Sequence, residues 1–150
     1  MRGADAHAGL AAAARLKRLA AALASGSPPP SEDAVWLAGR LGVYLAAEGE
    51  ADLDGVLGLL PPPGGSSWRT LAKHSERDRL IRELGSEMPG STHARAVVVQ
   101  SQMRRYAGTA WPRDRVAKQS SAANAALFAI FSLDPDPPTG IRRLTDIIGG

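Results

Sequence analysis

Cysteine is absent from this sequence and aromatic residues are scarce, with three Trp, two Tyr and two Phe among 150 residues. The absence of cysteine excludes disulfide bonds, thiolate zinc sites and cysteine nucleophiles. With so few aromatic side chains, any core must be built mainly from Leu, Ala, Val and Ile. A chain without cysteine is compatible with a reducing compartment, and we predict a cytoplasmic location.

Long uncharged apolar runs are also missing. The most apolar stretch near the N-terminus, residues 10–23, is interrupted in its middle by Arg15, Lys17 and Arg18. Three cations at this place fit neither the core of a signal peptide nor a helix that crosses a membrane. We therefore expect no association with a membrane.

The motifs of common catalytic and metal sites are lacking. His7, His74 and His93 are far apart, and none forms an H-x-x-x-H pair. The sequence contains no G-x-S-x-G elbow, no P-loop and no G-x-G-x-x-G. Glu76 and Asp78 stand among arginines, which keep carboxylates ionised and unsuited to acid catalysis. We predict a non-enzymatic protein with no cofactor and no metal.

Helical periodicity is the main structural signal. Apolar residues recur at helical spacing between breaks rich in proline and glycine, which predicts an all-α fold, a compact bundle of about six or seven short helices. The wide apolar face of the second of these helices, which includes Trp36 and Tyr44, indicates a helix of the core. The expected helices cover about residues 4–25, 31–48, 51–60, 66–88, 92–106, 120–133 and 141–148.

A proline-glycine segment at residues 61–65 suggests a division of the chain. Residues 1–60 would form an N-terminal helical part and residues 66–150 a basic C-terminal part, although a single domain over 1–150 is equally consistent with the pattern. Charge follows the same division. Residues 1–65 have five basic and seven acidic residues, a net charge of −2, whereas residues 66–150 have thirteen and eight, a net charge of +5.

The strongest functional signal lies between Arg95 and Lys118, where six basic residues are accompanied by one acid, Asp114. Arginines presented from a helix and the segment that follows it can neutralise phosphates and release counterions. A solvated arginine-rich surface is the alternative. We predict Trp111 as a core residue. The predicted nucleic-acid contacts are Arg95, Arg104, Arg105, Arg113, Arg115 and Lys118, with Arg142 and Arg143 as a second group.

Two places resemble a helix-turn-helix in outline. In the first, helix 120–133 precedes helix 141–148, and Arg142 and Arg143 stand near the start of the second helix. Because the connection contains three prolines, it is longer and stiffer than the usual turn, so a last helix that merely docks by its apolar face is an alternative. In the second, the turn at residues 88–91 precedes a reading helix at 92–106.

Several short motifs together support a resemblance. They are Ser67-Trp68-Arg69-Thr70, Arg77-Asp78-Arg79-Leu80-Ile81-Arg82-Glu83-Leu84, Arg104-Arg105-Tyr106, Trp111-Pro112-Arg113-Asp114-Arg115, Gly140-Ile141-Arg142-Arg143-Leu144, and the part from Trp36-Leu37 to Leu57-Gly58. In this order they resemble a group of small uncharacterised bacterial proteins, some encoded near prophage genes. The chain departs from that group at Pro112, where another basic residue is usual. The resemblance implies a mobile-element or DNA-associated context and transfers no binding residue.

These features predict a protein that binds duplex DNA as a regulator or as an accessory factor of a phage or mobile element. The alternative is a helical protein-interaction or assembly subunit without nucleic-acid binding, in which an exposed stripe on residues 11–23 or 35–45 meets a protein partner or a second copy. DNA binding predicts that the arginines share one face, whereas assembly predicts a large exposed apolar patch.

Overall fold

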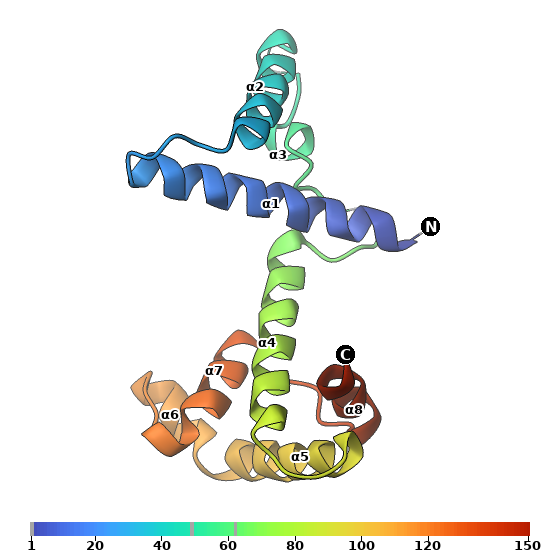
Figure 1. The fold of residues 1–150 in the computed structure, drawn as a ribbon, viewed down its shortest axis with the longest axis vertical. Coiled ribbons are helices and arrows are strands. Elements are labelled where there is room, and N and C mark those ends of the chain that lie inside the picture. Colours follow the sequence, from blue (N-terminus) through green and yellow to red (C-terminus); the bar gives the residue numbers. More distant parts are fainter. Residues whose placement is uncertain (1, 49, 62) are drawn as a thin grey trace. The chain divides into compact units, whose positions relative to one another are not determined.

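The computed structural model describes residues 2–48, 50–61 and 63–150, with side chains from residue 8 onward. Over these ranges the chain forms eight α-helices and one 3₁₀ turn, without a strand, so the all-α prediction is confirmed (Figure 1). The chain divides into two compact units, Met1–Ala72 and Lys73–Gly150. Gly49, in the segment that ends the predicted helix 31–48, and Pro62, in the predicted break 61–65, lie outside the described residues.

The first unit contains α1 (Arg2–Ala24), α2 (Ser31–Ala46), α3 (Leu53–Val56) and the first turn of α4 (Trp68–Ser86). Helix α1 ends where Gly26 adopts a φ of +68°, a conformation that glycine accepts without steric cost. The prolines that follow cannot extend the helix. Helix α2 then packs against both α1 and the single turn of α3.

Few apolar side chains are buried in this first unit. Among its described side chains, the buried hydrophobic ones are Ala12, Ala13, Leu19 and Leu57. The prediction that α2 is a core helix is wrong, because its one buried residue is Asp33, and Val35 and Leu45 are each 74% exposed. The reason is geometric: the contacts that α2 makes with α1 and with the four-residue α3 leave most of its apolar side chains uncovered.

Asp33 anchors α2 to α1. Its carboxylate is fully buried and accepts hydrogen bonds from Nε and Nη2 of Arg18 at 2.8 and 2.7 Å, and Nε of Arg15 lies 3.7 Å away. The hydrogen bonds from Arg18 lower the pKa of Asp33 below its ordinary value, against the opposing effect of desolvation. The ionised carboxylate is therefore the form that the fold stabilises.

Replacing Asp33 with asparagine should lower the melting temperature of the first unit at pH 7. Since the pKa of Asp33 is lower in the folded chain than in the unfolded one, its contribution is complete above the unfolded pKa, about 4, and is lost as the pH falls through the folded value. Thermal melts by circular dichroism at several pH values check this. The difference between wild type and Asp33→Asn should shrink below about pH 4; a difference that does not depend on pH would contradict the assignment.

The second unit combines the rest of α4 with α5 (Thr92–Thr109), α6 (Trp111–Ala117), the 3₁₀ turn η1 (Ala122–Asn124), α7 (Ala125–Leu133) and α8 (Ile141–Gly149). Helix α8 packs along α5, and α6 contacts both α5 and α7. These helices enclose a continuous core. Its buried members are Ile81, Leu84, Ala96, Val99, Met103, Tyr106, Leu127, Ile130, Phe131, Leu144 and Ile147.

Helix α6 was not predicted, so the structure contains one helix more than the sequence indicated. Pro112 stands in the first turn of α6, where the missing N–H is no loss because it would have no partner within the helix. The helix ends at Lys118, which adopts a left-handed conformation with a φ of 53°. Trp111 is partly buried against Phe128 and Phe131, which confirms its predicted place in the core.

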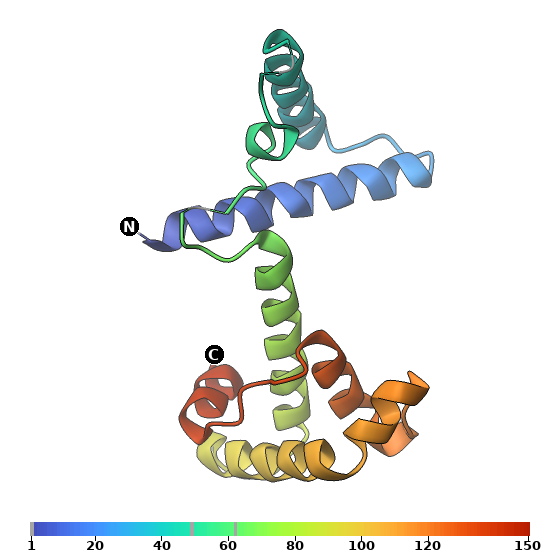
Figure 2. The ribbon, with the colours of Figure 1, turned by 180° about the vertical axis from the view of Figure 1, so that it is seen from behind.

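A helix-turn-helix stays a prediction. The segment between α7 and α8 spans residues 134–140, and α8 packs along α5, where Nε2 of Gln100 donates to the carbonyl oxygen of Thr139 at 2.6 Å. Figures 1 and 2 show α7 and α8 on opposite sides of α4. This arrangement favours the alternative in which the last helix docks by its apolar face, through Leu144 and Ile147.

Candidate nucleic-acid interface

Helix α5 has one buried face and one basic face. Ala96, Val99, Met103 and Tyr106 point into the core, so the opposite side of the helix faces solvent. Helix α5 contains three arginines and no acidic residue, and the sequence has no acid at all between Glu87 and Asp114. The exposed residues of α5 include Ala94, Val97, Val98, Ser101, Arg104, Arg105 and Gly108. The charged side chains on the exposed surface of α5 are therefore all positive.

Five exposed cations follow one another along the C-terminal half of α5 and through α6 to its cap. We call Arg104, Arg105, Arg113, Arg115 and Lys118 the basic group. Within the described part of the chain, Arg113 is the member that forms an ion pair, with Asp114 at 2.9 Å, and its side chain is still 74% exposed. Helices α5 and α6 pack against each other, so the five cations of the basic group lie on two helices that are in contact.

Asp114 is the acid nearest to the basic group, and it is turned inward. It is 3% exposed and accepts hydrogen bonds from the hydroxyl of Tyr106 at 3.1 Å and from Arg113 at 3.0 and 2.9 Å. Burial, and then the hydrogen bond to this carboxylate, raise the pKa of Tyr106 to about 12. The negative charge of Asp114 therefore lies inside the second unit and not on the solvent-exposed surface of α5 and α6.

The remaining three predicted contacts lie elsewhere. Arg95 is half-buried near the start of α5, nine residues and therefore about 13 Å along the helix from Arg104. Its Nε is buried and has no hydrogen-bond partner among the described residues. Arg142 and Arg143 are exposed on α8, and Arg143 donates to Asp78 at 3.1 Å. The structure thus separates the eight predicted residues into the basic group and a second set on α8 and the N-terminal half of α5.

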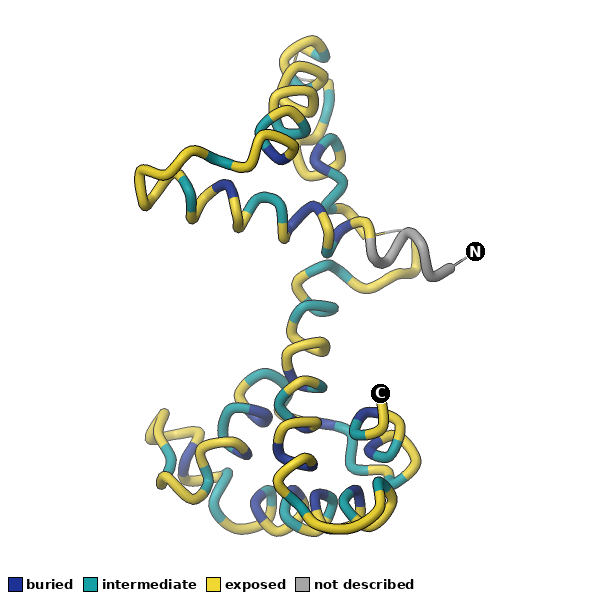
Figure 3. The backbone as a smooth tube through the Cα atoms, viewed as in Figure 1, coloured by how far each residue is buried: buried dark blue, intermediate teal, exposed yellow. Residues whose placement is uncertain are grey.

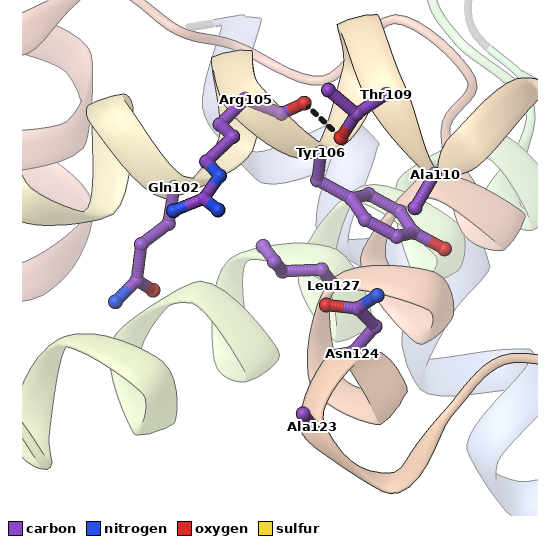
Figure 4. Close-up of a pocket in the computed structure, with 8 residues that line it drawn as sticks. All are labelled: Gln102, Arg105, Tyr106, Thr109, Ala110, Ala123, Asn124 and Leu127. Carbon is purple, nitrogen blue, oxygen red and sulfur yellow. Dashed lines mark hydrogen bonds between the residues drawn. The ribbon is translucent and has the colours of Figure 1, made fainter.

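A pocket of about 370 Å³ adjoins the basic group (Figure 4). In the close-up, the guanidinium of Arg105 and the amide of Gln102 lie on one side, and the amide of Asn124 lies below the Tyr106 ring on the other. A guanidinium and two carboxamides beside apolar atoms suit a phosphate oxygen or the edge of a base. Its lining residues are Gln102, Arg105, Tyr106, Thr109, Ala110, Ala123, Asn124 and Leu127.

Sequence reasoning found Arg105 but missed Gln102 and Asn124. The two amides are 22 positions apart, in α5 and η1, and only the packing of η1 and α7 beside α5 brings them to one pocket. Neither residue belongs to a motif or a charge cluster. The signal that could have found them is tertiary, and a single sequence does not contain it.

Other kinds of site receive no support from the described residues. Over the ranges 2–48, 50–61 and 63–150, no group of three or more acidic or histidine side chains is placed to hold a metal ion. No described helix combines the length and the apolar character needed to cross a bilayer. Comparison with protein-family models, with curated proteins and with solved structures found no match to the chain. The function is therefore inferred from charge and geometry.

Proposed function

We propose that this protein is a non-enzymatic DNA-binding protein that contacts duplex DNA through the basic group. The observation that supports this most directly is the acid-free outer surface of α5, continued by the cations of α6, beside an acid that is turned inward. Each exposed arginine or lysine that meets a phosphate releases condensed counterions, which favours binding to a polyanion of any sequence.

The shape of α5 suits this role. It has 18 residues, about 27 Å, and an α-helix fits the major groove of B-form DNA. Small exposed residues, Ala94, Ser101 and Gly108, recur at intervals of seven residues along α5 and allow the helix backbone to come close to a surface. Arg105 beside the pocket is the residue best placed to meet a base edge as well as a phosphate. We expect a cytoplasmic regulator or mobile-element accessory factor; the resemblance to prophage-associated proteins implies a mobile-element or DNA-associated context.

Fluorescence anisotropy with a labelled duplex over a salt series tests the proposal. Wild-type affinity should fall steeply with salt, and Arg104→Ala combined with Arg105→Ala should reduce the slope of log K against log salt by about 2, because two phosphate contacts are lost. The matched control is Lys17→Ala with Arg79→Ala. It removes the same net charge from exposed positions in α1 and α4.

Two outcomes would contradict the proposal. One is the absence of binding even at low salt. The other is an equal loss in the control variant, which would show that total charge and not the basic group determines affinity.

A further inference from the structure

Helix α2 presents large apolar side chains to solvent. Val35 and Leu45 are each 74% exposed, Val43 is 59% exposed and Leu41 is 39% exposed. Figure 3 shows exposed backbone along most of α2. An apolar surface of this kind on a folded helix is typical of a protein-protein contact.

Small residues lie between these large ones. Ala38, Gly39, Gly42 and Ala46 are all exposed, and a Cβ atom built at Gly39 or Gly42 meets nothing within 4 Å. Small residues allow the backbones of two helices to approach closely. The surface of α2 therefore has projecting side chains towards both ends, at Val35 and Leu45, and a flat middle.

This surface also has no charge. Between Val35 and Ala46 the one ionisable side chain other than the hydroxyl of Tyr44 is Arg40, and it donates to the carbonyl oxygen of Val56 at 3.1 Å, on the side of α2 that meets α3. Helical spacing places the exposed Arg40 about 140° around the helix from Val35 and about 60° from Val43, at the edge of the surface. An apolar partner suits this surface better than DNA or a strongly charged peptide, because a charge buried there would have no partner.

We propose that α2 is a self-association surface and that its partner is α2 of a second copy of this chain. A two-fold axis near the middle of the helix would place Val35 of each copy beside the small Ala46 of the other, so the surface is complementary to itself. The antiparallel arrangement also places opposite ends of the two helix dipoles side by side. The second copy completes the apolar burial that the first unit, with its four buried hydrophobic side chains, lacks.

The size of the surface sets the expected affinity. Residues 35–46 extend about 17 Å along the helix, and one pair of helices of this length buries less than the 1,200–2,000 Å² of a standard interface, so a weak dimer is expected. Such a dimer would be populated at laboratory concentrations and would dissociate on dilution.

Analytical ultracentrifugation of the full chain from about 1 to about 200 µM tests this, at high salt so that the basic group is screened. Wild type should change from monomer to dimer across the range. Val35→Lys with Leu45→Lys should raise the dissociation constant at least tenfold, because a dimer would bury four lysines. Val116→Lys, at a residue of the second unit that is 78% exposed, is the control and should dimerise like wild type.

The Gly42→Leu variant tests whether a weaker dimer results from a lost contact between the two copies or from unfolding of α2. Leucine favours a helix more than glycine does, and the space around Gly42 is empty in the single chain, so helix content should not fall. In the dimer the leucine would hold the two backbones apart and should raise the dissociation constant at least tenfold. Helix content is checked by circular dichroism.

Two results would overturn the proposal: a wild-type chain that stays monomeric over the whole range, or variants of α2 that dimerise as tightly as wild type. The inference does not rest on DNA binding. Arg104→Ala with Arg105→Ala should dimerise normally, so failure of the one proposal is distinguishable from failure of the other.

Discussion

Replacing Arg77 with alanine is expected to lower the free energy of unfolding of the second unit by about 3 kcal/mol. The side chain is 7% exposed, and its guanidinium donates to Asp78 at 2.9 and 2.6 Å and to Asp134 at 2.5 Å. These bonds join α4 to the segment that follows α7. Without Arg77, Asp134 loses its charged partner while 80% of its side chain stays buried, which is the costly way to break an ion pair.

Thermal unfolding by calorimetry measures this effect. For a unit of 60–100 residues, a loss of about 3 kcal/mol corresponds to a fall in melting temperature of about 12–24 °C. Arg79→Ala is the control, because Arg79 is an exposed neighbour on the same helix that pairs with Glu76 and Glu83. Exposed pairs of this kind contribute little, so the control should melt close to wild type. Equal shifts in the two variants would show that the Arg77 network is not structural.

Arg77→Lys adds a second measurement. Lysine keeps the positive charge but cannot donate to Asp78 and Asp134 in the fixed forked geometry of a guanidinium. The free energy of unfolding of the Arg77→Lys variant should lie between those of wild type and Arg77→Ala. If the lysine variant equals wild type, charge alone supports the contact between α4 and the end of α7.

The fold could be predicted from the sequence where local signals determine structure. Prolines and glycines mark the ends of α1 and α4, and the breaks before α2 and α8, because these residues act within one turn of the backbone. Helix α6 escapes prediction because the short segment between the expected helices 92–106 and 120–133 has no clear apolar periodicity, and because proline is suited to a loop as well as to a first helical turn. The burial of α2 could not be predicted, since apolar periodicity does not reveal whether a second helix is available to cover it.

The candidate site could be predicted only in part. The concentration of arginine between residues 95 and 118 is visible in the sequence, and the structure keeps five of those cations on the C-terminal half of α5 and on α6. Which charges are free depends on tertiary contacts. Arg143 reaches Asp78 across 65 positions, and Asp114 is buried and accepts a hydrogen bond from the hydroxyl of Tyr106. Charge can be read from a sequence, whereas burial and partners require the folded chain.

Replacing Ile81 with alanine should reduce the free energy of unfolding by about 3 kcal/mol, and Ile81→Val by about 1 kcal/mol. Ile81 is fully buried in the core that α4 shares with α5, α7 and α8. The two variants remove different amounts of packed volume, so a graded loss indicates a close-packed core. Chemical denaturation followed by circular dichroism measures it, with Val116→Ala at an exposed position as control. A loss below about 1 kcal/mol for Ile81→Ala would contradict the packing seen here.

The same variants also separate stability from function. Ile81 has no exposed surface, whereas the basic group lies on the outer side of α5 and on α6. Well below its melting temperature, Ile81→Ala should therefore bind duplex DNA with the wild-type salt slope, because its phosphate contacts are intact. A reduced slope in the folded variant would mean that the core controls how α5 presents Arg104 and Arg105, and the interface would then depend on the core as well as on surface charge.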